Sequence, residues 1–366
     1  MSSSPDLIVI GGGVIGLAIA RELKLRGVGR VRLLEKGRVG REASWAAAGI
    51  LAPQVEADAD GDFFRLCYAS NNIYPDYAAG LLAETGIDVE LDQRGTLYAG
   101  FDESDAEEFE KRRRWQSDAG LSVEKLDRAG VNILEPNVSD RAECGLYFPD
   151  DGQVENRKLV EALTASVRSL GVEIEEGVEV NEIITSDGNV EGVETSNRRI
   201  HSDRVVIATG AWSSLIKIGD ASLPVKVKPI RGEMICYEPP GISVQHVVYS
   251  SRGYLVPRAD GRLLAGATAE DVGFDSETTA DGRRTLINVA EEIVPALNEQ
   301  KPTDHWAGLR PYADGGLPFI GKVEGVSGLF AAVGHFRNGI LLTPITARII
   351  GDAVAGGTAA SHTVKF

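Results

Sequence analysis

Three glycines and one acidic residue near the start of the chain have types and spacing that could hold a nucleotide. Gly11, Gly13 and Gly16 form a GxGxxG turn between the apolar stretch at 7–10 and a helix-like stretch, and Glu35 closes the next apolar stretch. In such a turn the backbone approaches a pyrophosphate, the helix N-terminus faces the phosphates, and the carboxylate accepts hydrogen bonds from both ribose hydroxyls. Because strand, turn, helix, strand and acid occur in the order that this motif requires, the sequence predicts a site for an ADP moiety and disfavours a 2′-phosphate.

Three further segments indicate how the rest of the ligand is held. The stretch "GREASWAAAGILAP" at 40–53 has small residues that let an extended backbone lie against a flat ligand. The stretches "RVVIATGAWS" at 204–213 and "GLFAAVGHFRNGILLTPITARIIGDAV" at 328–354 each place an apolar strand before a glycine-containing turn. A pyridine-nucleotide dehydrogenase usually completes its sheet locally, so these distant turns favour one long ligand cradled by the whole chain, with helix amides at its anionic end.

Taken together, these motifs resemble a known family. The GxGxxG turn with Glu35, "ASWAAAGILAP", "IATGAW", "YLVPRADGRLLAGAT", "WAGLRP" and "GHFRNGILLTP" are similar to the D-amino acid oxidase superfamily, and most similar within it to the glycine oxidases of thiamine biosynthesis. The match is collinear and spans nearly the full length. It implies an α/β fold of two domains: a Rossmann-like FAD-binding domain assembled from separated segments, and a substrate domain with a mixed or antiparallel sheet over the flavin.

The resemblance also implies which positions contact non-covalently bound FAD. The adenosine and pyrophosphate contacts fall on the first glycine turn and the residues after it, the flavin contacts on the later turns, and an adenine contact on the "EGVEVNEI" stretch. The positions are Gly11, Gly13, Val14, Ile15, Gly16, Glu35, Lys36, Ser44, Ala47, Gly49, Ile50, Leu51, Val180, Gly210, Trp212, His335, Arg337, Asn338, Gly339, Ile340 and Leu341.

Arg310, Tyr254 and Arg337 match the substrate-contacting positions of the family. A guanidinium such as that of Arg310 can clamp a carboxylate through two parallel hydrogen bonds, and the Tyr254 hydroxyl could donate another. Considered alone, Arg310 could instead be a surface residue paired with Asp314, and Tyr254 could pack in the core. His335 could likewise be a structural histidine.

Two positions depart from one branch of the family. Arg252 stands where a neutral or imidazole side chain can line the pocket mouth, with a solvated arginine as the alternative, and Ala269 replaces a bulkier apolar residue. Both changes bear on the exact substrate rather than on the reaction.

The chemistry implied is oxidation of glycine, sarcosine or a small D-amino acid. Hydride leaves the α-carbon for flavin N5, the imine hydrolyses to glyoxylate or a 2-oxo acid, and O2 reoxidises the flavin to give hydrogen peroxide. Since no carboxylate or histidine stands out as a base, catalysis would rest on positioning. Two alternatives remain open: a dehydrogenase that uses an acceptor other than oxygen, and a catalytically silent flavin-binding subunit. The resemblance alone implies a role in thiamine thiazole synthesis.

Composition narrows the partners and the compartment. The formal net charge is −16 and the pI is about 4.9, so nucleic acid and membrane surfaces are poor partners. Three widely spaced cysteines, Cys67, Cys144 and Cys236, suit a reducing compartment, and "MSSSPD" lacks the basic region of a signal peptide. We therefore expect a cytoplasmic protein without a metal site. Homotetramers occur in the family, so a homo-oligomer is expected.

The two expected domains are interleaved along the chain. The FAD-binding part is assigned to 1–75, 151–215 and 305–366, and the substrate part to 76–150 and 216–304. Within the latter, "FDESDAEEFEKRRRWQSDAG" at 101–120 has acidic residues before a basic run at helical spacings. This pattern predicts a solvated helix with internal charge pairs.

Overall fold

The computed structural model describes residues 4–238 and 241–356, and its centre is a six-stranded, mostly parallel sheet. Only β19 at one edge runs antiparallel to its neighbour. In spatial order the strands are β19 (Phe319–Lys322), β20 (Leu329–Val333), β12 (Val205–Ile207), β1 (Leu7–Ile10), β2 (Val31–Glu35) and β8 (Glu173–Glu176). Segments far apart in the sequence thus build one sheet, as the three glycine turns predict.

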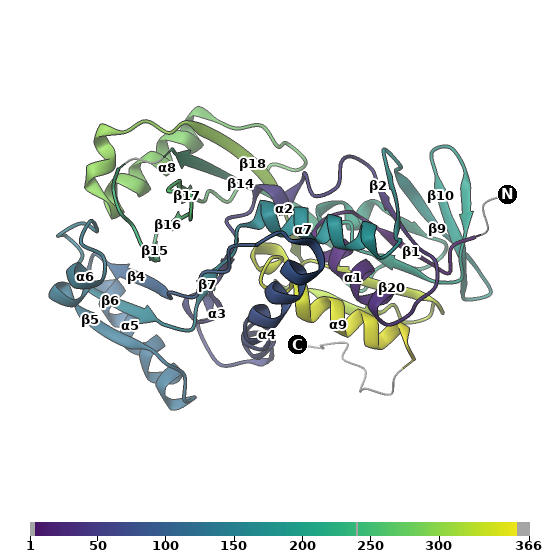
Figure 1. The fold of residues 1–366 in the computed structure, drawn as a ribbon, viewed down its shortest axis with the longest axis horizontal. Coiled ribbons are helices and arrows are strands. Elements are labelled where there is room, and N and C mark those ends of the chain that lie inside the picture. The colour runs from purple at the N-terminus through teal and green to yellow at the C-terminus, as the bar shows by residue number, and fades with distance from the viewer. Residues whose placement is uncertain (1–3, 239–240, 357–366) are drawn as a thin grey trace.

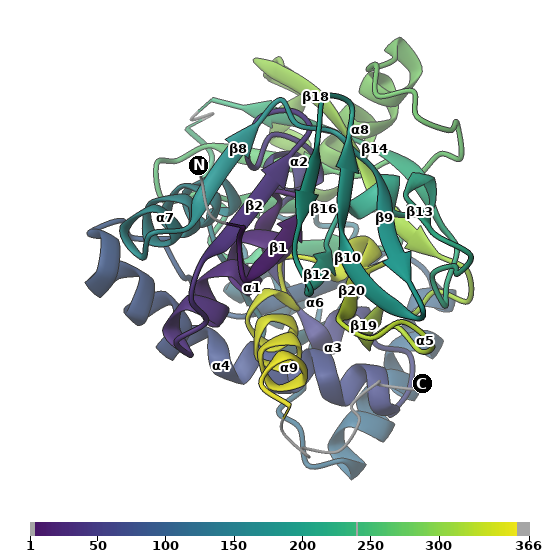
Figure 2. The same ribbon diagram turned by 90° about the vertical axis from the view of Figure 1, so that its right-hand side faces the viewer.

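Each face of this sheet is covered by a different layer. Leu7 and Val9 pack against helices, whereas Ile8 and Ile10 pack against a second sheet, because successive side chains of a strand point to opposite faces. The helices are α1 (Val14–Leu25), α4 (Asp62–Thr85), α7 (Asn156–Ser169) and α9 (Thr343–Val354). The second sheet contains β11 (Arg199–His201), β10 (Asn189–Thr195), β9 (Val180–Ser186) and β13 (Lys217–Ile218), and Figure 2 shows β9 and β10 on the side opposite α1 and α9.

An eight-stranded mixed sheet forms the other end of the molecule (Figure 1). Its strands, in spatial order, are β18 (Asp304–Ala313), β14 (Val227–Tyr237), β17 (Leu263–Gly266), β16 (Gly253–Pro257), β15 (Val247–Ser250), β4 (Thr96–Gly100), β6 (Cys144–Phe148) and β5 (Glu124–Asp127). Helix α8 (Ala280–Ile293) packs on one face through an apolar core that includes Ile235 and Leu255, and the opposite face carries Met234 and Tyr249.

The remaining elements lie between or beside these layers. They are α2 (Ala43–Ala46), β3 (Ile50–Leu51), α3 (Pro53–Glu56), α5 (Glu103–Asp118), α6 (Arg128–Leu134), β7 (Gly152–Gln153), η1 (Gly210–Leu215), η2 (Pro295–Glu299) and η3 (Phe336–Asn338). Strands β3 and β7 pair in a small antiparallel ribbon.

Two elements cross the boundaries expected between the domains. Helix α4 continues through position 75 to Thr85. Strand β18, expected in the FAD-binding part, pairs along its whole length with β14 in the eight-stranded sheet. Residues 357–366 of the expected third FAD-binding segment lie outside the described residues.

The helix predicted within 101–120 is α5, but its description as a solvated helix is wrong for one face. Internal charge pairs do occur, such as Arg113 with Glu110. However, the Arg112 side chain is only 5 % exposed and contacts the segment after α3. Its burial could not be predicted, because the contacts lie about 55 residues away in the sequence.

Candidate active site

A cavity of about 500 Å³ extends from the start of α1 to the face of the eight-stranded sheet. At one end it is lined by Gly13, Val14 and Ile15, and at the sheet by Tyr254 and Arg310. The predicted nucleotide turn and the predicted substrate residues therefore open into the same space.

The glycines of the first turn have distinct structural roles. Gly11 has φ +106°, and a Cβ on it would lie 2.3 Å from the Ala208 carbonyl oxygen. A Cβ on Gly16 would lie 1.9 Å from the carbonyl oxygen of Gly11, so both positions require glycine for strand–helix packing. A Cβ on Gly13 would meet only the Ser44 hydroxyl, at 3.1 Å, so the cavity in front of this backbone is open to a ligand.

Glu35 lies at the end of β2, and its carboxylate is buried. It accepts hydrogen bonds from the backbone amides of Gly12 and Gly37, each at 2.7 Å. These contacts stabilise the turn itself, and each carboxylate oxygen retains a second lone pair for a ribose hydroxyl.

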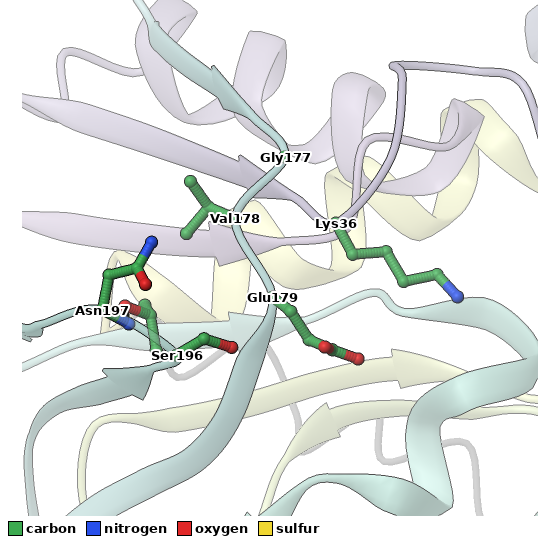
Figure 3. A pocket seen from close by; sticks show the side chains of 7 residues that line it. Lys36, Gly177, Val178, Glu179, Ser196 and Asn197 are labelled. Carbon is green, nitrogen blue, oxygen red and sulfur yellow. Dashed lines mark hydrogen bonds between the residues drawn. The ribbon is translucent and has the colours of Figure 1, made fainter.

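A smaller cavity of about 260 Å³ lies beside the end of β2 (Figure 3). Lys36 lines it from the β2 side, and Glu179, Ser196 and Asn197 line it from the loops around β9 and β10. The remaining lining residues are Gly177, Val178 and Thr195. Of the residues predicted here only Lys36 belongs to the lining, and its ammonium lies 3.3 Å from the Trp212 ring centroid.

The segment of small residues at 43–51 forms one wall of the main cavity. Arg258 donates to the Ala48 carbonyl at 2.9 Å, and Asn156 donates to the carbonyls of Ser44 and Trp45 at 2.9 and 3.0 Å. Burial lowers the pKa of Arg258 to about 10. Because every one of these carbonyls is held by a side chain from elsewhere, the wall has a defined shape.

Tyr254 and Arg310 approach each other over the central strands of the eight-stranded sheet. Tyr254 extends from β16 across Gly266 of β17, where a Cβ would lie 2.6 Å from the ring. Arg310 extends from β18 across Gly232 of β14, and its Nη1 donates to the Thr268 carbonyl at 2.9 Å. Burial raises the pKa of Tyr254, while the charges of Arg310 and Arg337 oppose that rise.

Glu56 is a cavity residue that the sequence analysis missed. Its Oε1 accepts hydrogen bonds from Arg337 Nη2 and from the Tyr249 hydroxyl, each at 3.0 Å. The Glu56 charge raises the pKa of Arg337, and burial together with Glu56 raises that of Tyr249 well above its usual value. Before Arg337 the backbone of Phe336 has φ +47°, an uncommon conformation that directs this turn into the cavity.

His335 is buried beside the cavity, and its Nε2 lies 3.1 Å from the Thr346 hydroxyl. Burial lowers the pKa of His335 to about 4, so the imidazole is neutral near pH 7. This environment suits a neutral structural or flavin-side histidine.

Most residues predicted to contact the ligand line the main cavity. These are Gly13, Val14, Ile15, Ser44, Ala47, Gly49, Ile50, Gly210, Tyr254, Arg310, His335, Arg337, Asn338, Gly339 and Ile340, together with Arg252 and Ala269. Those outside its lining are Gly11, Gly16, Glu35, Leu51, Val180, Trp212 and Leu341, together with Lys36, which lines the smaller cavity. The residues on its walls that the sequence did not reveal include Met234 and Thr268, and the available signal was the glycines placed within the neighbouring strands.

Other chemistries find less support in the part of the chain that the structure describes. There, no cluster of three or more His, Cys, Asp or Glu side chains could hold a metal ion. Cys67, Cys144 and Cys236 are free thiols, and none of them lines either cavity. No helix within 4–238 or 241–356 is long and apolar enough to cross a membrane.

The fold and the cavity define the class of flavin-dependent oxidoreductases, in which a glycine-turn domain faces a sheet that carries substrate groups. Residues 6–353 match the family described as DAO, FAD dependent oxidoreductase. The chain belongs to this family, and its cofactor is FAD.

Individual relatives are similar over nearly the whole chain. A glycine oxidase of Pseudomonas aeruginosa is 35 % identical over 355 residues, which cover 96 % of this chain and 95 % of that protein. The crystal structure of glycine oxidase from Geobacillus kaustophilus has a TM-score of 0.93 and 33 % identity, covering 98 % of this chain and 97 % of the other. The bifunctional protein ThiO/ThiG of Synechocystis is 37 % identical over 360 residues, covering 97 % of this chain but only 52 % of that protein, so the chain spans about half of the bifunctional relative.

Proposed function

We propose that this protein is an FAD-dependent oxidase of glycine and similarly small amino acids, such as sarcosine or small D-amino acids. The observation that carries the proposal is the approach of Arg310 and Tyr254 over two strand glycines, within a cavity that begins at the dinucleotide turn. Such a pair recognises the carboxylate of an amino acid and little else. This limited recognition favours the smallest amino acids as substrates.

The residues of the cavity fit FAD. The first turn exposes backbone at Gly13, where the α1 N-terminus provides amides for a pyrophosphate. Glu35 and Lys36 would hold the adenosine end near the smaller cavity, and the wall at 43–51 with the turn at 335–341 would flank the flavin. When bound, FAD supplies a ring that accepts a hydride from the substrate α-carbon and passes the electrons to O2.

The chain's own residues bind and orient the substrate. Arg310 offers a bidentate, permanently charged donor to the substrate carboxylate, and the Tyr254 hydroxyl donates beside it. Tyr254 stays protonated because its pKa is raised by burial. Fixing the carboxylate at two points directs the α-carbon, and such positioning is a large part of the rate enhancement in reactions that need no proton transfer.

Among the described residues, the histidine and the carboxylates on the cavity wall are already engaged, and Asp58 accepts from Arg112 at 2.8 Å. His335 is buried, with its Nε2 near Thr346, and Glu56 already accepts from Arg337 and Tyr249. The substrate therefore reacts as the neutral amine, whose lone pair assists departure of the hydride. The resulting imine takes up water and releases ammonia or amine with glyoxylate or a 2-oxo acid.

The walls limit the size of the substrate. Tyr249 and Met234 line the cavity near Tyr254, whereas Ala269 leaves space on that side. Arg252 lines the cavity but pairs with Glu292 at 2.9 Å and has a side chain 68 % exposed, which places it at the mouth. We propose that Arg252 attracts carboxylates to the mouth within an acidic protein.

The wider setting is proposed from the same resemblance. The enzyme would supply oxidised glycine for thiamine thiazole synthesis, act in the cytoplasm and form a homo-oligomer. The three free thiols support a reducing compartment. For the domains we keep the assignment of 1–75, 151–215 and 305–366 to FAD and of 76–150 and 216–304 to substrate, with β18 shared because it carries Arg310.

The experiment that tests the proposed reaction is anaerobic reduction of the bound flavin by glycine and by C-deuterated glycine. Hydride loss in the slow step predicts that the yellow colour bleaches more slowly with the deuterated substrate. Equal rates, with chemistry shown to limit the reaction, would contradict hydride transfer. No bleaching with any small amino acid would contradict the substrate class.

A further inference from the structure

The segment that carries Glu56 cannot hold its own shape. Helix α3 is only four residues long, Pro53–Glu56, and is followed by an extended residue, Ala57. Nevertheless Ala52, Val55, Glu56 and Asp58 all line the main cavity. A single helical turn in water is unstable, so its position must come from contacts with other elements.

Arg112 of α5 provides those contacts on one side. The Arg112 side chain is 5 % exposed, and its guanidinium meets the carbonyl end of α3. Its Nη1 donates to the carbonyl oxygens of Gln54 (3.3 Å), Val55 (2.7 Å) and Ala57, and its Nη2 donates to the Asp58 carboxylate (2.8 Å). One fixed fork of donors therefore binds residues on both sides of Glu56, and charge-assisted hydrogen bonds of this kind are the stronger ones.

Further buried groups hold the start of the segment. Gln54 and Gln116 are both fully buried and exchange hydrogen bonds: Gln54 Nε2 donates to Gln116 Oε1 at 2.9 Å, and Gln116 Nε2 donates to the Gln54 carbonyl at 2.8 Å. The Asp151 carboxylate accepts from the backbone amides of Gln54 and Val55 at 3.2 and 3.1 Å. These contacts fix the start of α3, whereas Arg112 contacts the carbonyls of Val55 and Ala57, which lie on the two sides of Glu56.

The Glu56 side chain connects α3 to the other residues that line the cavity. Its Oε1 receives hydrogen bonds from both Arg337 and Tyr249. Arg310 and Arg337 both line the main cavity together with Tyr254, so the two guanidiniums share one space. With Glu56 in place, the charge of Arg337 is compensated and Arg310 is left as the site for a single carboxylate.

We propose that Arg112 is a positioning residue for the substrate cavity: by holding the carbonyls of α3 it keeps Glu56 against Arg337, and so restricts the cavity to ligands with one carboxylate. The identity of the substrate in this proposal rests on the proposed function, whereas the arrangement of charges does not depend on it. If Glu56 moves away, Arg337 becomes an unpaired cation that can bind a second carboxylate.

The first test measures the binding of acetate and of malonate to the FAD-loaded protein. The change in the flavin spectrum reports the binding of each ligand. Arg112→Gln and Glu56→Gln should each lower the dissociation constant of malonate relative to that of acetate. The expected change in this ratio is about tenfold, for one new charge-assisted contact. In the double variant the shift should equal that of Glu56→Gln alone, because Arg112 acts through Glu56. The matched control is Arg113→Gln on the same helix, which loses only its pair with Glu110 and should not change the ratio.

Additive shifts in the double variant, or an unchanged ratio in Arg112→Gln, would overturn the proposal. If Arg112→Gln does not fold, Arg112→Lys keeps the charge without the planar fork and should give a smaller shift of the same sign; an unchanged ratio there would also overturn it.

The second test needs neither ligand nor turnover. Hydrogen exchange of the amides of Gln54 and Val55 should accelerate in Arg112→Gln but not in Arg113→Gln, because only the former releases α3. The amides of Glu56 and Ala57, which lie next to the carbonyls that Arg112 holds, should accelerate as well, and unaltered exchange at these two amides in Arg112→Gln would overturn the proposal even if the enzyme were active. Conversely, a protein that shows the predicted exchange and ligand ratios but releases no peroxide with any amino acid would contradict only the proposed function.

Discussion

The guanidinium of Arg310 lies directly over Gly232 of the neighbouring strand: a Cβ added to Gly232 would be 1.9 Å from Nη1. The strand glycine is therefore part of the proposed substrate site, since it provides the space in which the arginine reaches the cavity. Tyr254 has the same relationship to Gly266 from the opposite direction.

This relationship predicts the effect of Gly232→Ala. The atoms that the new methyl group meets belong to the end of a flexible side chain, so the fold should persist while the guanidinium is displaced. Loss of a charge-assisted contact costs about 1.5–3 kcal/mol, so the KM for glycine should rise about 10- to 100-fold. Steady-state kinetics measures the effect, with Gly61→Ala as control because a Cβ there meets nothing within 4 Å. An unchanged KM would show that Arg310 does not bind the carboxylate.

Two glycines of the first turn should respond differently to alanine. At Gly13 a methyl group would lie 3.1 Å from the Ser44 hydroxyl, a tight contact that a small movement of this side chain relieves, and it would enter the space assigned to the pyrophosphate; Gly13→Ala should therefore lose FAD affinity while the apoprotein keeps most of its stability. At Gly16 it would collide with the Gly11 backbone, so Gly16→Ala should destabilise the apoprotein itself. FAD titration and thermal unfolding of both variants separate the two effects. Full FAD affinity in Gly13→Ala would place the cofactor elsewhere.

The pH dependence of stability should contain a contribution from His335. Its folded pKa of about 4 lies below the ordinary value of 6.5, so the neutral form is favoured by folding. This contribution is complete above pH 6.5, because neither state is then protonated. The contribution is lost as the pH falls toward 4, because His335 takes up a proton in the unfolded chain but stays neutral in the folded protein. The free energy of unfolding should therefore decrease by about 3 kcal/mol from this group.

Urea unfolding at several pH values and a fixed FAD concentration tests this assignment. The free energy of unfolding of the wild-type protein relative to His335→Gln should decrease by that amount between pH 7 and pH 4. A difference that stays constant over this range would mean that His335 titrates normally.

FAD should be released when the protein is denatured in acid. Covalent attachment would need a nucleophilic thiol or imidazole at the flavin. Cys67, Cys144 and Cys236 all lie away from the cavity lining, and the Nε2 of the buried His335 lies 3.1 Å from the Thr346 hydroxyl. Burial also raises the pKa of Cys236 to about 11, which keeps this thiol protonated. Acid precipitation should leave a colourless pellet and yellow supernatant; a yellow pellet would reveal a covalent bond.

The nucleotide-binding half of the fold could be predicted from the sequence because its signals are local. Gly11, Gly16 and the strand that ends at Glu35 follow one another within one strand–helix–strand unit, and each meets a steric requirement that the spacing expresses. The predicted Rossmann-like arrangement and mixed sheet are confirmed by the structural match to glycine oxidase.

The substrate half could be predicted only in part. Arg310 and Tyr254 were identified through motifs, but Glu56 has no signal around it: its partner Arg337 is 281 residues away. The sequence predicts only a solvated helix within 101–120, because charge spacing along a helix does not show which arginine will meet the carbonyl groups of a distant segment. Such contacts depend on how the two sheets are placed together, which is a property of the whole fold.

Hydrogen peroxide release from the purified, FAD-loaded protein tests the central claim most directly. The substrates are glycine, sarcosine, D-alanine and a bulky D-amino acid, and the flavin spectrum is recorded in the same samples. An oxidase with a cavity confined by Tyr249, Tyr254 and Met234 should release peroxide with glycine and sarcosine well ahead of the bulky substrate. Bleaching without peroxide would indicate an acceptor other than oxygen, and a flavin that stays yellow with every substrate would contradict the account.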